Sequence, residues 1–203
     1  MQTSPASTPT GNTYDKYASA NPIERRMMEG FFAALDASLP TTAPATVLEV
    51  GAGEGEVAVR IREKFPTAAL SILDLPDDEL GSHWRGLGLS GTFGSVETLP
   101  FPDASFDLVL GIEMLEHVPD PALALQELRR VCRGKAVFSV PREPIWRVLN
   151  MGRGKYLRDL GNTPGHIQHW SKRSFAAEIG RQFQVEAVRA PLPWTMVQAT
   201  VSD

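Results

Sequence analysis

The sequence predicts an α/β protein built on a mostly parallel sheet. Short apolar segments rich in β-branched residues alternate with segments of helical periodicity, which is the pattern of repeated strand–helix–strand units. The first unit is the clearest. A strand over 46–50 runs into a turn with glycines at alternate positions (Gly51, Gly53 and Gly55), and a helix over 55–64 follows. Residues without side chains let the backbone of such a turn approach a ligand at the carboxyl edge of the sheet.

Three further helices are predicted from apolar residues at helical spacing and from proline or glycine near the helix ends. Pro121 suits the first position of a helix, because its missing N–H is not needed there. The three helices cover 23–39, Pro121 to about Cys132 with Gly134 ending the helix, and Ser171 or Lys172 to Phe183.

The remaining strands alternate with these helices until the end of the chain. Phe106 to Ile112 is apolar almost throughout, as expected for a strand buried on both faces. No helix separates the last two strands, so they are expected to form a hairpin whose final strand runs antiparallel to the rest. The other predicted strands cover 69–73, 91–96, 136–140, 185–190 and 194–201.

Length and composition indicate one domain, expected over 14–203, after a tail over 1–13 that has little to bury and is expected to be disordered. The formal net charge of −4 argues against non-specific nucleic-acid binding. No apolar run reaches the roughly 18 residues of a membrane span, and no secretory signal is expected, so a cytoplasmic location is predicted. Cys132, the single cysteine, is expected to be a small core residue.

The glycine turn is not spaced like the dinucleotide fingerprint G-x-G-x-x-G. The chain has E-x-G-x-G-x-G instead, beginning at Glu49. This pattern resembles motif I of the class I S-adenosylmethionine (SAM)-dependent methyltransferases. The resemblance implies that SAM is the cofactor, that S-adenosylhomocysteine (SAH) is its product, and that the cofactor contacts Glu49, Gly51, Ala52, Gly53 and Gly55.

An acidic residue, Asp74, ends the second strand. It follows the glycine turn at about the 20-residue distance at which nucleotide-binding folds place a carboxylate on a ribose diol. A solvated residue at a strand end is the alternative, but the glycine turn favours the ribose. Leu75, beside it, is also expected at the cofactor.

The segment 94–103 reads G-S-V-E-T-L-P-F-P-D and resembles the family's G-D-A-E-x-L-P-F. The family's aspartate bonds the adenine amino group, and here Ser95 stands in its place. A hydroxyl carries no charge, so recognition of adenine is expected to depend more on the backbone and apolar contact of Val96. The resemblance also puts Glu97 at the cofactor.

The segment 111–121 contains L-E-H-V-P-D-P and resembles the family's L-E-H-V-x-D-P. By that resemblance Gly111, Ile112 and Glu113 line the methionine side of the cofactor. His117 usually orders this loop in the family, and a role as general base is the less favoured alternative.

The resemblance covers about 46–140 and implies a Rossmann-like, seven-stranded, mostly parallel sheet with helices on both faces and an antiparallel last strand. It also implies a helical cap over 14–40 that folds over the cofactor. Tyr17 or Tyr14 could supply an aromatic contact from this cap, although ordinary packing of the helix would explain them equally well.

The segment 141–170 is long for a mere connection, and long loops are usually functional. Basic and aromatic side chains are interleaved in it, which suits a lid over an anionic small-molecule acceptor. A short amphipathic helix over about 144–151, whose charges are simply solvated, is the alternative. The residues predicted to contact the acceptor are Arg142, Trp146, Tyr156 and Trp170.

Residues 165–171, G-H-I-Q-H-W-S, resemble a short signature of small-molecule methyltransferases. Either histidine could take the acceptor's proton, because an imidazole pKa near 6.5 suits a base at neutral pH. His166 is favoured, since it is expected in an exposed turn after Pro164 and Gly165, whereas His169 could be a packed anchor. The histidines show no grouping with acids or cysteine that suggests a metal site, so no metal is expected.

These features predict a methyltransferase that acts on oxygen or nitrogen, less favourably carbon, of a small molecule such as a secondary metabolite. Two alternatives stay open. One is a SAM-binding protein without methyl transfer. The other is an RNA or protein methyltransferase that uses the basic residues of 142–158, although no nucleic-acid partner is expected. A monomer and a homodimer are equally compatible with the sequence.

Overall fold

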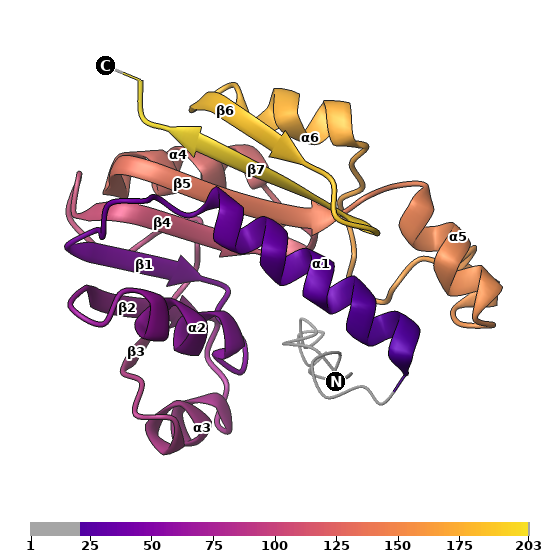
Figure 1. Cartoon of the computed structure of the whole chain (residues 1–203), viewed down its shortest axis with the longest axis horizontal. Helices are drawn as coiled ribbons and strands as arrows, with labels where there is room; N and C mark the ends of the chain where they lie inside the picture. The colour runs from indigo at the N-terminus through magenta and orange to yellow at the C-terminus, as the bar shows by residue number, and fades with distance from the viewer. Residues whose placement is uncertain (1–20, 203) are drawn as a thin grey trace, which may run out of the picture.

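The computed structural model describes residues 21–202, in which one seven-stranded sheet lies between helices (Figure 1). The predicted tail over 1–13, the start of the predicted cap and Tyr17 lie outside the described residues. In chain order the elements are α1 (Pro22–Ser38), β1 (Thr46–Val50), α2 (Glu56–Lys64), β2 (Ala69–Asp74), α3 (Leu80–Gly86), β3 (Gly91–Phe93), β4 (Phe106–Ile112), η1 (Leu115–His117), α4 (Pro121–Val131), β5 (Cys132–Pro141), α5 (Ile145–Gly152), η2 (Leu157–Asp159), α6 (Lys172–Ile179), β6 (Gln184–Arg189) and β7 (Trp194–Thr200).

The strand order is β3-β2-β1-β4-β5-β7-β6. Strands β1 to β5 pair in parallel, and β7 runs antiparallel to both β5 and β6. The predicted fold class is therefore confirmed, including the antiparallel last strand. The strand order reverses between β1 and β4, and ligands of open α/β sheets bind in the crevice at the carboxyl ends of the strands at such a point.

Helices cover both faces of the sheet because each presents an apolar stripe. On one face α1 and α2 pack through residues such as Phe31 and Ile61, and on the other α4 and α6 pack through residues such as Leu128 and Phe175. In Figure 1 α1 crosses in front of the sheet and α4 lies behind it. Within residues 21–202, no helix has the length and apolar character needed to cross a bilayer.

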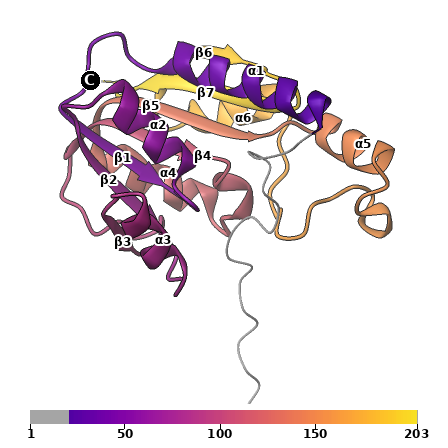
Figure 2. The ribbon, with the colours of Figure 1, turned by 60° about the horizontal axis from the view of Figure 1, so that its bottom comes forward.

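The chain after β5 leaves these layers, and α5 lies beyond the end of the sheet (Figure 2). Hydrogen bonds fold this segment back on itself. The buried Asn150 amide donates to the carbonyl oxygen of Gly161 at 2.9 Å, and the indole N–H of Trp146 donates to Thr163 Oγ1 at 2.9 Å. The segment after β5 therefore has a defined structure. It lies at the same edge of the sheet as the carboxyl ends of β1 and β4.

The prediction that Gly134 ends a helix is wrong. Strand β5 already begins at Cys132, and Gly134 lies within it. A Cβ at Gly134 would stand 2.4 Å from the carbonyl oxygen of Asp107 on the neighbouring strand β4. Glycine is required here by a close approach of two strands, not by a helix end.

The ends of two elements and the presence of one helix also differ from prediction. Strand β3 ends at Phe93 and α6 ends at Ile179, both earlier than expected. The short helix α3 was not predicted, because Trp84 is its only buried residue and it shows no apolar period. That indole N–H donates to the carbonyl oxygen of Gly53 at 2.8 Å, so α3 braces the glycine turn.

Candidate active site

The glycine turn after β1 has the left-handed backbone that its sequence requires. Gly51, Gly53 and Gly55 have φ angles of +73°, +51° and +90°, and Gly55 is the N-cap of α2. A Cβ at Gly51 would lie 2.5 Å from Met114 Cγ, so a side chain there would collide with the loop after β4. A Cβ at Gly53 would meet nothing within 4 Å among the described residues, which leaves space for a ligand beside this residue.

Asp74 lies at the end of β2, beside this turn. One of its carboxylate oxygens accepts a hydrogen bond from Gly53 N–H at 2.7 Å, and the other accepts from Leu75 N–H at 2.7 Å. Burial raises the pKa of Asp74, and these two N–H groups oppose that rise. The carboxylate therefore joins the two strand ends into one cradle. The Leu75 side chain is exposed.

Glu49 supplies a second carboxylate, inside β1. The residue is only 2% exposed, and its Oε2 has no hydrogen-bond partner among the described residues. Burial raises the pKa of Glu49 well above its usual range, and the charge of Asp74 raises it further. A buried carboxyl group without such a partner is costly, and a cation bound in the cradle would stabilise its ionised form. The two carboxylates and the bare glycine turn therefore fit an adenosyl sulfonium cofactor.

The predicted adenine segment follows β3. The Ser95 hydroxyl accepts a hydrogen bond from the N–H of Glu97 at 3.1 Å, so it is already engaged in a local turn. Glu97 Oε1 in turn accepts from the N–H of Asp120 at 3.1 Å, which ties the segment to the start of α4. Val96 is buried in the core, and only part of its surface is left for a ligand.

Gly111 and Ile112 end β4 and are buried, and Glu113 follows them with a positive φ of +55°. The Glu113 side chain turns toward the other strands. Its carboxylate accepts from the Ser139 hydroxyl at 2.9 Å and from the indole N–H of Trp194 at 2.6 Å. A role at the cofactor would therefore fall mainly to the backbone of this strained turn, and the side chain links β4 to β5 and β7.

A cavity of about 110 Å³ opens next to this turn. It lies between the start of α1, the loop after β4 and the segment after β5. Its lining is aromatic and sulfur-containing with several ionisable groups: Glu24, Met27, Met28, Glu113, Glu116, His117, Trp146, Asn150, Arg153, Lys155, Tyr156, Thr163, His166 and Trp194.

Two of the four predicted acceptor contacts, Trp146 and Tyr156, line this cavity. The other two lie elsewhere. Trp170 is buried in the core against Phe175, with ring centroids 5.6 Å apart, and Arg142 forms a backbone bridge with it. The spacing of the aromatic residues in the sequence did not distinguish Trp146, which lines the cavity, from Trp170, which packs in the core.

His166 also lines the cavity, but not in the expected exposed turn, because it is 8% exposed. Its ring stacks on Trp146 at 5.9 Å and meets His117 edge to face at 4.9 Å. His169 lies outside the cavity, where its Nε2 contacts Asn162 Oδ1 at 2.8 Å and an Arg147 nitrogen at 2.9 Å. Burial, then the charge of Arg147, lowers the pKa of His169.

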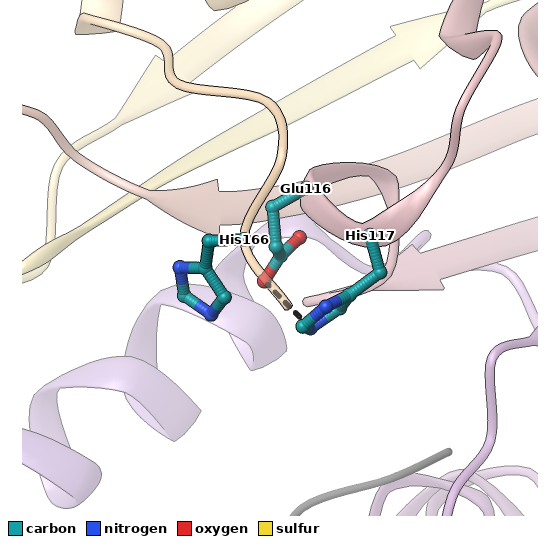
Figure 3. A group of neighbouring side chains, drawn as sticks. All are labelled: Glu116, His117 and His166. Carbon is teal, nitrogen blue, oxygen red and sulfur yellow. Dashed lines mark ion pairs between the residues drawn. The ribbon is translucent and has the colours of Figure 1, made fainter. Parts of the chain in front are cut away.

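Sequence reasoning missed the carboxylate beside these rings. Glu116 is 2% exposed, and its Oε1 is 4.0 Å from His117 Nε2. Glu116, His117 and His166 each offer one atom to a group whose members lie within 4.8 Å of one another (Figure 3). The pair Glu116-His117 was visible in the sequence, but nothing there connected it to His166.

Comparisons with known proteins agree with this geometry. Residues 48–140 match the family model described as a methyltransferase domain. The chain is 32% identical over 133 residues to malonyl-[acyl-carrier protein] O-methyltransferase of Geobacter sulfurreducens, and this alignment covers 62% of this chain and 47% of that protein. It is 36% identical over 95 residues to fatty-acid O-methyltransferase of Mycolicibacterium smegmatis, and this alignment covers 45% of this chain and 35% of that protein. The chain thus matches less than half the length of these relatives.

Solved structures share the fold. A protein from Pyrococcus horikoshii OT3 superposes with a TM-score of 0.70 at 16% identity, over 94% of this chain and 97% of that one. The matched residues 48–140 carry the cradle and match the methyltransferase-domain family. Their sheet has the fold of class I SAM-dependent methyltransferases, and SAM is the cofactor that the cradle fits.

Proposed function

We propose that the protein transfers the methyl group of SAM to an oxygen or nitrogen atom, less favourably carbon, of a small molecule held in the cavity. One observation carries the proposal: the cofactor cradle and the cavity are neighbours. Met114 packs against the glycine turn at Gly51, and Glu113, the residue before it, lines the cavity. A methyl donor in the cradle would therefore face an acceptor across the turn after β4.

The cradle residues would hold the cofactor by complementary charge and hydrogen bonding. The carboxylates of Glu49 and Asp74 would face the cationic part and the ribose, and the backbone of Gly111 and Ile112 would line the methionine part. Bound SAM supplies a methyl group that is already activated, so the protein has mainly to orient the acceptor and exclude water.

The segment 141–170 would act as the lid over the acceptor. Arg153 in this segment pairs with Glu24 of α1 at 3.0 Å, so the lid and the first helix close the cavity together. The rings of Trp146 and Tyr156 would contact the acceptor, and the charge of Lys155 would attract an anionic acceptor. The names of the two relatives specify transfer to oxygen, which favours oxygen here. A secondary metabolite or lipid intermediate in the cytoplasm is the expected setting.

The acceptor's proton would be lost at the group formed by Glu116, His117 and His166, which all line the cavity. His166 is the favoured acceptor of that proton, and the outlying His169 is the less favoured one. Replacing His166 with alanine should leave SAM affinity nearly unchanged and lower turnover at least about tenfold, since a positioned base contributes roughly 10²–10⁴-fold.

The proposal is tested by measuring SAH production from SAM with a panel of fatty acids, hydroxylated aromatics and amines, and with a cell extract. Wild type should form SAH with at least one source of acceptor, and Asp74→Ala should form little. Tight SAH binding without SAH formation from any source would favour a SAM-binding protein that transfers no methyl group. Salt-dependent binding of RNA would instead favour the nucleic-acid alternative.

A further inference from the structure

Three metal-ligating side chains converge at the cavity from two distant parts of the chain. Glu116 and His117 belong to η1, after β4, and His166 belongs to the loop before α6. In Figure 3 the Glu116 carboxylate points into the space between the two imidazole rings. One oxygen and two ring nitrogens from these side chains lie within 4.8 Å of one another.

The tautomer of His117 suits a ligand. Its Nδ1 lies 2.9 Å from the carbonyl oxygen of Gly165. A carbonyl oxygen only accepts hydrogen bonds, so Nδ1 carries the proton and the lone pair of the neutral ring is on Nε2. Nε2 is the atom that faces Glu116 Oε1. Metal-binding histidines commonly donate their second N–H to a backbone carbonyl in this way, which fixes the orientation of the ring.

The backbone holds the two halves of the group together. The carbonyl oxygen of Glu116 accepts hydrogen bonds from the N–H groups of Ile167 and Gln168 at 2.9 and 3.1 Å. The Gln168 side-chain amide donates to the carbonyl oxygen of Val118 at 3.2 Å. On the other side of His166 in sequence, the Gly165 carbonyl oxygen contacts His117. His166 is thus held against η1 by its neighbours on both sides, which reduces the ordering that ion binding would require.

The donor set defines the class of ion. Two imidazoles and one carboxylate suit Zn²⁺, Co²⁺ or Fe²⁺, whereas Mg²⁺ prefers oxygen ligands throughout. Ligands at roughly 2.0–2.2 Å from a tetrahedral ion stand about 3.3 Å apart. The three atoms would therefore draw together by about 1.5 Å at most. The half-exposed side chain of His117 has the freedom to do so.

We propose that Glu116, His117 and His166 bind a divalent transition-metal ion whose open coordination positions face the cavity. An acceptor hydroxyl or carboxylate oxygen would bind at an open position. Coordination lowers the pKa of a hydroxyl, so its proton would leave to solvent and not to His166, which would then be an ion ligand. The bond from the acceptor oxygen to the methyl carbon would form as the methyl–sulfur bond of SAM breaks and SAH leaves. The role of the ion toward the acceptor rests on the proposed function, whereas ion binding itself does not.

Zn²⁺ binding by metal-free protein tests the proposal directly. Calorimetry should show one site in wild type. In His117→Ala and Glu116→Gln, affinity should fall by at least about 100-fold, since loss of an outer-shell partner alone costs roughly 10–100-fold. The matched controls His83→Ala and Glu63→Gln change exposed residues far from the group in sequence, and both should bind as wild type does. Mg²⁺ should not compete.

Co²⁺ provides a second readout that needs no enzymatic activity. Wild type should give the visible absorption of a low-coordinate Co²⁺ site, and His166→Asn should abolish it while thermal melts show a folded protein. Equal Zn²⁺ affinity in wild type and the cluster variants, or a Co²⁺ spectrum unchanged by all three, would overturn the proposal. SAH formation by a protein that binds no ion would also overturn the proposal. His166 would then remain the base of the proposed function. Ion binding without SAH formation would support the site while the proposed function fails.

Discussion

Replacing Asp74 with asparagine should separate the charge of the cofactor cradle from its shape. In the native protein the carboxylate accepts one N–H from Gly53 and one from Leu75, each at 2.7 Å. A hydrogen bond to a charged group contributes about 1.5–3 kcal/mol. Asparagine keeps one acceptor oxygen and turns an NH₂ group toward the other N–H, so unfolding should become easier by about 2 kcal/mol.

The same change should weaken cofactor binding, because a ribose diol would lose a charged acceptor. A loss of about 2–3 kcal/mol corresponds to a roughly 30- to 150-fold weaker affinity for SAH. Protonation of the wild-type carboxylate mimics the substitution. Since burial raises the pKa of Asp74, wild-type affinity should begin to fall at a higher pH than an exposed aspartate would dictate, and the variant should not show this pH dependence.

Titration calorimetry with SAH, supported by thermal melts, measures both effects. The exposed neighbour Asp78 provides the matched control, and Asp78→Asn should bind SAH as wild type does. A folded Asp74→Asn protein that binds SAH within twofold of wild type would refute the assignment of this carboxylate to the cofactor. That result would mean that Asp74 serves only to accept the hydrogen bonds from the N–H groups of Gly53 and Leu75.

Three further perturbations test the cradle and the sheet. Gly51→Ala should lower the free energy of unfolding by more than the roughly 1–2 kcal/mol that a left-handed residue costs, because its Cβ would also collide with Met114; an unchanged free energy of unfolding in denaturant melts would contradict this. Burial raises the pKa of Glu49, and a bound cation should lower it again. At pH values between the two, SAM binding should release a proton, so the binding enthalpy should depend on the buffer in wild type and less so in Glu49→Gln. Arg133 lowers the pKa of Asp107 to about 2, which stabilises the fold above the usual aspartate pKa and is lost as the pH falls toward 2. Asp107→Asn should therefore cost about 1–2 kcal/mol at neutral pH in urea melts, less than the full shift because the side chain is partly exposed, and should flatten the acid limb; equal stability at pH 7 would contradict it.

The sequence predicted what local rules determine. The turn from Gly51 to Gly55 and the carboxylate of Asp74 are set by neighbours in the chain, because a strand, a left-handed turn and a helix follow one another directly. The antiparallel β7 was predictable for a similar reason, since a hairpin needs no crossover helix. Gly134 shows where such rules fail: its lack of a side chain accommodates Asp107 on the next strand, and a contact between strands leaves no mark in local sequence.

The structure of the cavity proposed for the acceptor depends on contacts between residues far apart in the sequence. Trp146 and Trp170 belong to one segment and have similar surroundings in the sequence, yet one faces the cavity and the other the core. His166 was expected in an exposed turn because Pro164 and Gly165 precede it. It is buried because the following residues donate to the backbone of η1 and draw the loop inward. The chemistry of a histidine follows from what holds its two ring nitrogens, and for His117 that partner is a carbonyl group supplied by the distant loop. Substitutions in this loop that leave both histidines unchanged can therefore alter the reactivity of the site.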